Sequence, residues 1–105
     1  MRLVNGFTIV WRFTIHPESK VRFESLYGPN GAWAVLFARS AGYRGTELLR
    51  DTSEPGSYLT IDRWESESAF EEFRRQFAAQ YEALDRECEG LTRTEIKIGK
   101  FERRD

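Results

Sequence analysis

Cysteine and histidine are nearly absent from this chain, which contains one of each, Cys88 and His16, among 105 residues. A single cysteine excludes an intrachain disulfide and a cysteine-based metal cluster. Neither zinc spacing nor a glycine-rich phosphate loop or dinucleotide fingerprint is present. We therefore expect no metal and no cofactor, since flavin and nicotinamide have no visible binding motif.

No charge of one sign dominates, because sixteen basic residues face seventeen acidic ones and the net charge is −1. This balance argues against a nucleic-acid-binding surface. Apolar runs stay well below the roughly 20 residues that span a bilayer, and the N-terminus lacks the basic-then-apolar pattern of a signal peptide. We expect a cytoplasmic protein with no nucleic-acid and no membrane partner.

Aromatic residues, in contrast, are abundant at 14%, and apolar periodicity predicts most of the secondary structure. Alternation of apolar and polar residues predicts strands over residues 7–15 and 91–101, and the strand-like runs 43–51 and 57–65 flank a turn-rich connection short enough for a hairpin. His16-Pro17-Glu18 begins a helix that ends at Gly28, and a short helix around Trp33 follows. Ser66 caps a long helix that Gly90 closes. Its apolar stripe comprises Phe70, Phe73, Phe77, Tyr81, Leu84 and Cys88.

The predicted order is β-α-β-β-α-β, a ferredoxin-like α+β domain covering residues 1–105. Right-handed crossovers place both helical segments on one face of a four-stranded antiparallel sheet.

The central hairpin predicts a partner for the opposite face of the sheet. If Leu48 pairs with Thr60, Leu49, Leu59 and Ile61 lie on the face without helices, where Glu47 and Arg63 form a cross-strand pair. An antiparallel sheet that is wet on one side alternates more cleanly than this. We expect a homodimer packed sheet to sheet. The alternative is that a few exposed leucines are normal.

Three segments resemble one known family. They are Tyr27-Gly28-Pro29-Asn30-Gly31-Ala32-Trp33, then Gly42-Tyr43-Arg44-Gly45-Thr46-Glu47-Leu48, and finally Leu59 to Phe70 with its Trp64-Glu65-Ser66. Their order and spacing are similar to the antibiotic biosynthesis monooxygenases. The resemblance implies a dimeric α/β barrel with a cavity between helices and sheet. Some members of that family oxygenate polycyclic phenols with molecular oxygen and no cofactor, and others degrade haem.

Trp64 is the first candidate for a catalytic residue, because the resemblance implies that a tryptophan at this position lines the cavity. Period-two alternation places Asp62, Thr60 and Tyr58 on the same side of the strand. The structural alternative for Trp64 is a core residue beneath the long helix. Asp62 is the second catalytic candidate, as a polar group of the site; the identity of the base that deprotonation of a phenol requires stays open.

An aromatic substrate also requires an apolar pocket with a few polar groups. The remaining candidate substrate-binding residues come from the first strand and the helices: Trp11, Phe13, Trp33, Phe73, Phe77, Gln80 and Tyr81, with Arg12 and Gln76 as further polar groups. Most of these have a simpler interpretation as core or surface residues.

Haem breakdown is disfavoured within the family. The resemblance implies an asparagine where Trp11 stands and a histidine near Gln80, and no histidine exists between residues 17 and 105. His16 fits capping or a surface contact better than catalysis, and Cys88 fits a small buried apolar residue.

Two functions remain open. The first is a cofactor-independent monooxygenase that acts on a small aromatic or quinonoid molecule. The alternative is a non-catalytic domain that binds a small ligand or mediates assembly, since function depends on the site and not on the fold.

Overall fold

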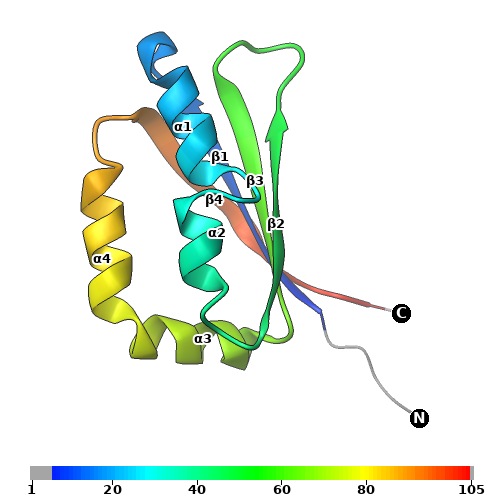
Figure 1. The fold of residues 1–105 in the computed structure, drawn as a ribbon. Helices are drawn as coiled ribbons and strands as arrows, with labels where there is room; N and C mark the ends of the chain where they lie inside the picture. The colour runs from blue at the N-terminus through cyan, green and yellow to red at the C-terminus, as the bar shows by residue number, and fades with distance from the viewer. Residues whose placement is uncertain (1–5, 105) are drawn as a thin grey trace.

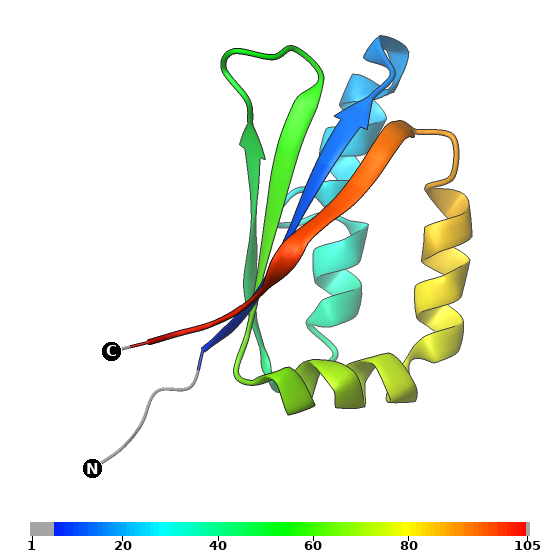
Figure 2. The same cartoon turned by 180° about the vertical axis from the view of Figure 1, so that it is seen from behind.

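The computed structural model describes residues 6–104 and has the predicted order of elements. Its sheet has the strand order β2-β3-β1-β4 with antiparallel neighbours throughout, and the helices cover one face (Figures 1 and 2). The elements are β1 (Phe7–Ile15), the 3-10 turn η1 (Pro17–Ser19), α1 (Lys20–Tyr27), α2 (Ala32–Phe37), β2 (Tyr43–Arg50), β3 (Ser57–Trp64), α3 (Glu67–Gln76), α4 (Ala78–Glu87) and β4 (Thr92–Glu102). The ferredoxin-like α+β prediction is confirmed.

Alternation along the strands sorts side chains onto two faces as predicted. Phe7, Ile9, Phe13 and Ile15 of β1 are all at most 5% exposed and face the helices. The predicted hairpin register is also confirmed, because Leu48 lies opposite Thr60. This register places the β3 positions 58, 60, 62 and 64 on the helix-covered face.

The face without helices carries several large apolar side chains. The strand registers align Leu49, Leu59 and Ile96 with Arg12 in one row across the sheet. Leu49 is 43% exposed and Ile96 is 52% exposed. The predicted pair of Glu47 and Arg63 is present on this face, with 3.5 Å between Oε2 and Nη1.

The prediction of one long helix after Ser66 is wrong. The chain leaves helical geometry at Phe77, with φ −114° and ψ 31°, and divides into α3 and α4. Figure 1 shows α3 crossing the lower end of the sheet and α4 turning back alongside α2. The bend lets Phe73 pack on Trp64 while Tyr81 packs on Trp33, with ring centroids 5.3 and 5.0 Å apart.

Three smaller predictions concern local contacts. Ser66 caps α3, because its Oγ accepts the Ala69 N–H at 3.1 Å. His16 makes a surface contact, with Arg93 Nε donating to its Nδ1 at 3.4 Å. Cys88 is buried, at 2% exposure. Among residues 6–104, no helix is long and apolar enough to cross a membrane.

Candidate active-site cavity

A cavity of about 330 Å³ lies between the sheet and the helices. Its size falls near the lower end of the range for small-molecule sites. Six of the residues proposed from the sequence line it: Trp11, Phe13, Trp33, Thr60, Asp62 and Tyr81. The remaining lining residues are Tyr27, Phe37, Thr46, Arg74, Asp85, Glu95 and Lys97.

Trp64 and Phe73 do not line this cavity. Both are 1% exposed and belong to the aromatic core. The Trp64 ring packs on Phe37 at 5.4 Å, and Phe37 itself lines the cavity. The Trp64 indole N–H is buried and has no hydrogen-bond partner within the described part of the chain. Trp64 therefore lies one layer behind the cavity wall.

Three further candidates also lie away from the cavity. Phe77 is partly buried at the break between α3 and α4, and Gln80 is exposed on α4. Tyr58 shares its face with Thr60 and Asp62 but is the second residue of β3, near the end of the sheet where β2 and β3 are joined. There its ring packs on Phe23 at 4.9 Å, and its hydroxyl donates to Glu24 Oε2 at 2.5 Å.

The two additional polar candidates are also outside the cavity. Arg12 points to the face without helices, because it alternates with the cavity-lining Trp11 and Phe13. Its Nη1 donates to Ser57 Oγ at 2.6 Å. Gln76 is exposed at the end of α3.

Asp62 is a cavity-lining carboxyl whose pKa is altered by its surroundings. Burial raises the pKa of its carboxyl to about 6, and a hydrogen bond from Thr46 acts in the opposite direction. Thr46 Oγ1 donates to Asp62 Oδ1 at 2.7 Å. The Tyr43 hydroxyl lies 2.6 Å from the same Oγ1. Since Thr46 has one proton and an ionised carboxylate only accepts, Tyr43 donates to Thr46 and Thr46 donates to Asp62.

A β-bulge makes this chain of hydrogen bonds geometrically possible. Tyr43 and Thr46 are three residues apart, so a regular strand would place them on opposite faces. The register shifts between Tyr43 and Gly45, which leaves Arg44 unpaired in the ladder. Gly45 has φ +132°, a conformation that favours glycine. The bulge places both side chains on the helix-covered face, where Thr46 lines the cavity, and bulges are frequent next to functional sites.

Charged and aromatic side chains pair on the walls of the cavity. The Lys97 ammonium lies 5.5 Å from the centre of the Trp11 ring, and the Arg74 guanidinium lies 4.0 Å from that of Tyr81. Burial raises the pKa of Tyr81, with Arg74 opposing the shift. Both Lys97 and Glu95 could have been found from the sequence. Alternation of Thr94, Ile96 and Ile98 on one face implies that residues 95 and 97 face the other.

The site therefore combines a carboxyl that is half-protonated at about pH 6 with a pocket of aromatic rings. Such a carboxyl is ionised near neutrality and is a stronger base than an ordinary aspartate. It is suited to removing a proton from a weakly acidic aromatic molecule held against the rings.

Comparisons with known proteins agree with this architecture. The family model described as antibiotic biosynthesis monooxygenase matches residues 6–81. Deoxynogalonate monooxygenase from Streptomyces nogalater is 36% identical over 63 residues, which are 60% of this chain and 50% of that protein. The match thus spans about half the length of this curated relative.

Solved structures extend the similarity to nearly the whole chain. A mutant of SnoaB, a cofactor-independent oxygenase from Streptomyces nogalater, is 31% identical with a TM-score of 0.70, covering 95% of this chain and 94% of its own. A Bordetella bronchiseptica protein described as a putative antibiotic biosynthesis monooxygenase shares the fold at 18% identity, with a TM-score of 0.72 and coverage of 96% and 97%. The chain belongs to the antibiotic biosynthesis monooxygenase family.

Proposed function

We propose that this protein oxygenates a small aromatic phenol or quinonoid precursor in the cavity, using molecular oxygen and no cofactor. The observation that carries the proposal is the Asp62 carboxyl, whose pKa is raised to about 6 by burial. It faces a pocket lined by Trp11, Phe13 and Trp33. The relatives described as a monooxygenase and as a cofactor-independent oxygenase support this class of reaction.

In the proposed mechanism the ionised Asp62 removes a proton from the bound substrate. The resulting anion transfers one electron to oxygen, and the two radicals combine to form a carbon–oxygen bond. The peroxide takes up a proton and then loses water, leaving a carbonyl at the oxidised carbon. One substrate and one oxygen molecule thus give one quinone-type product and one water.

The walls of the cavity position the substrate in this mechanism. Trp11, Trp33 and Tyr81 offer ring faces for stacking, and Lys97 supplies a positive charge beside Trp11. That charge favours the substrate anion over the neutral form. Thr60 is a buried hydroxyl in the lining and provides a hydrogen bond for orientation.

Trp64 acts through packing in this proposal. It supports Phe37 from behind, in an edge-to-face contact at 5.4 Å, and so fixes one wall of the cavity. We therefore assign Trp64 a positioning role and reserve direct contact with the substrate for the lining residues. Trp64→Phe should raise KM more than it lowers kcat if this assignment is right.

We also propose that two copies pack through their uncovered sheet faces. The apolar row of Leu49, Leu59 and Ile96 would be covered in such a two-fold dimer. A face-to-face arrangement leaves the cavity accessible from the helix side in each protomer.

Oxygen uptake with a panel of anthrones and naphthols tests the proposed function. We expect wild type and Glu82→Gln, a charge-matched control at an exposed residue of α4, to consume oxygen with at least one compound and to incorporate label from ¹⁸O₂. Asp62→Asn should lose most of this activity, on the order of a hundredfold or more for a general base. Uptake no faster than buffer for every compound would contradict the proposal.

A non-catalytic binding role is the second candidate, and the close packing of Trp64 and Phe73 in the aromatic core favours it, since both were expected to line the cavity. Saturable quenching of tryptophan fluorescence by the same panel, without oxygen uptake or product, would support this function over the first.

A further inference from the structure

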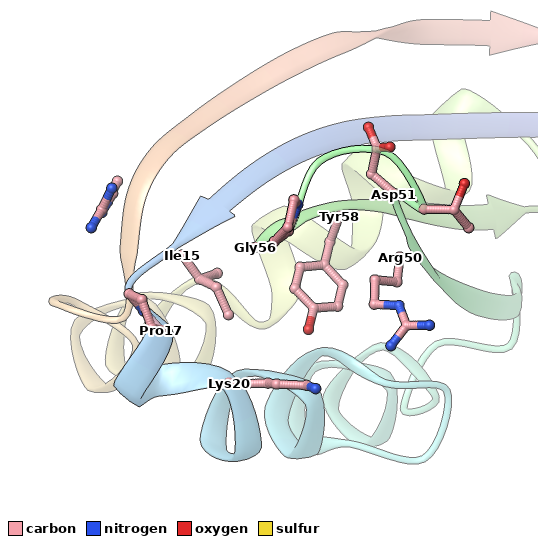
Figure 3. Close-up of a pocket in the computed structure, with 10 residues that line it drawn as sticks. Ile15, Pro17, Lys20, Arg50, Asp51, Gly56 and Tyr58 are labelled. Atoms are coloured by element: carbon pink, nitrogen blue, oxygen red, sulfur yellow. The ribbon is translucent and has the colours of Figure 1, made fainter.

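A second pocket, of about 480 Å³, lies at the end of the sheet where β2 and β3 are joined (Figure 3). It shares no lining residue with the cavity that contains Asp62. Its lining residues come from the end of β1, the start of the first helical segment, the β2–β3 connection and β4: Ile15, Pro17, Lys20, Arg50, Asp51, Thr52, Pro55, Gly56, Tyr58 and Arg93.

Two cationic side chains converge on this pocket without a carboxylate partner. In Figure 3, Lys20 of α1 and Arg50 of β2 extend toward each other beside the Tyr58 ring. Within residues 6–104 neither forms an ion pair, although Arg12, Arg22 and five other basic residues do. Two like charges aimed at one space repel each other, and an anion between them would remove that repulsion.

Two carboxylates at or beside the pocket, Asp51 and Glu24, accept hydrogen bonds from other groups. Asp51 Oδ1 accepts the backbone N–H groups of Ser53 and Glu54 at 2.8 and 3.2 Å, and Oδ2 lies 3.5 Å from Arg12. These donors hold the pKa of Asp51 below its ordinary value, and the Ser53 N–H has the largest effect, ahead of the Glu54 N–H and Arg12. Glu24 accepts the Tyr58 hydroxyl at 2.5 Å. Neither acid forms an ion pair with Lys20 or Arg50.

The floor of the pocket is apolar, in contrast to its rim. Ile15 is 5% exposed and Tyr58 is 2% exposed. Pro17 and Pro55 flank them in the lining. Burial, together with the hydrogen bond to Glu24, raises the pKa of Tyr58 to about 12, so its phenol stays neutral. A ligand here would meet the aromatic and aliphatic surface of Tyr58 and Ile15 together with the cations Lys20, Arg50 and Arg93 and the carboxylate of Asp51.

We propose that this pocket is a second ligand site, which binds a small organic anion with an apolar body and a single carboxylate or phosphate group. Lys20 and Arg50 hold the anionic group through charge-assisted hydrogen bonds. The Tyr58 ring and Ile15 contact the apolar body. This site and the cavity that contains Asp62 share no lining residue, so binding here does not depend on the oxygenation proposed for that cavity.

Titration of ¹⁵N-labelled protein followed by NMR tests this site with three probes: benzoate, phenyl phosphate and benzyl alcohol. We expect saturable shifts at the Thr52 and Gly56 amides with at least one of the two anions. Benzyl alcohol, which keeps the ring and lacks the charge, should bind at least tenfold more weakly. Comparison of benzoate with phenyl phosphate then identifies the preferred anionic group.

Substitutions at the two cations provide the decisive comparison. Lys20→Gln and Arg50→Gln should each weaken anion binding by about tenfold, since charge-assisted bonds are the stronger ones. Both residues are exposed, so the variants should keep the wild-type spectrum elsewhere. Arg22→Gln, on the same helix but paired with Glu87, is the matched control and should bind like wild type.

Anion binding that is unchanged in the Lys20→Gln, Arg50→Gln double variant would overturn the proposal. Shifts that do not saturate, or that spread over the surface, would overturn it as well. None of these outcomes depends on oxygen uptake, so failure of this site and failure of the proposed oxygenase function can be distinguished.

Discussion

Thr46→Val removes the hydroxyl that links Tyr43 to Asp62 while keeping the shape of the side chain. In the wild type, Thr46 Oγ1 donates to Asp62 Oδ1 at 2.7 Å. A hydrogen bond to a charged group contributes roughly 1.5–3 kcal/mol. Because Asp62 is only partly buried, we take about half of that range as the effect on its ionised form.

A difference of 1.36 kcal/mol corresponds to one pH unit. We therefore expect the pKa of Asp62 in Thr46→Val to rise by about one pH unit above its wild-type value of about 6. Thr46→Ser retains the hydroxyl and is the matched control. Tyr43→Phe should produce a smaller rise in the same direction, because it removes only the donor to Thr46.

The assay is a ¹³C NMR titration of the Asp62 carboxyl carbon in the three variants and the wild type. A midpoint in Thr46→Val that equals the wild-type midpoint would refute the reasoning, since the hydrogen bond would then contribute nothing to ionisation. A midpoint that falls would also refute it.

Three other predictions concern strain, stability and assembly. Gly45→Ala should cost about 1–3 kcal/mol of unfolding free energy, because its φ of +132° strains a residue with a Cβ even though the Cβ would meet no other atom. The same variant should shift the titration midpoint of Asp62. Gly90→Ala, with a φ of +89°, is the control and should lose stability without changing that midpoint. Since the pKa of Asp62 is raised in the folded state, the contribution of Asp62 to stability is largest below about pH 4 and is lost as the pH rises through about 6. Asp62→Asn should remove this decline of about 3 kcal/mol in denaturant melts, and an unchanged decline would exclude Asp62 as its source. Ile96→Glu should halve the mass measured by light scattering, while Val21→Glu, at a residue 82% exposed on α1, should not; a wild-type mass of one chain would remove the dimer.

The sheet was predictable because alternation and register depend on local patterns. The residues of β1 alternate over nine positions, and the pairing of Leu48 with Thr60 follows from a short hairpin connection. That register was enough to place Thr60 and Asp62 on the face that contains the cavity. Side-chain direction in a strand has period two, so one correct register orients the residues of both strands as far as the pairing stays regular.

The break at Phe77 was not predictable from periodicity. The apolar stripe continues through it at helical spacing, and no glycine or proline marks it. The break results from tertiary packing, since Phe73 and Tyr81 pack against different elements. Because α4 consequently turns away from α3, Gln80 lies in solvent and Phe77 remains at the corner.

The bulge at Gly45 explains why Tyr43 was missed. An unbroken strand would place Tyr43 on the face opposite to Thr46, whereas the predicted pairing of Leu48 with Thr60 already sets Thr46 opposite Asp62. A glycine inside a strand pattern is the available signal, since it often marks a bulge. Trp64 was placed on the correct face but wrongly in the cavity wall. The helix-covered face of β3 holds both cavity-lining residues and core residues, and period-two alternation does not distinguish between them.

The pH dependence of oxygen uptake tests most directly the claim that Asp62 is the general base. The rate of Asp62→Asn is subtracted at each pH, which removes the part of the rate that comes from substrate already ionised in solution. The account predicts that kcat/KM rises with pH, with a midpoint near the Asp62 pKa of about 6, and reaches a plateau above pH 7. An identical profile and rate in Asp62→Asn would contradict it.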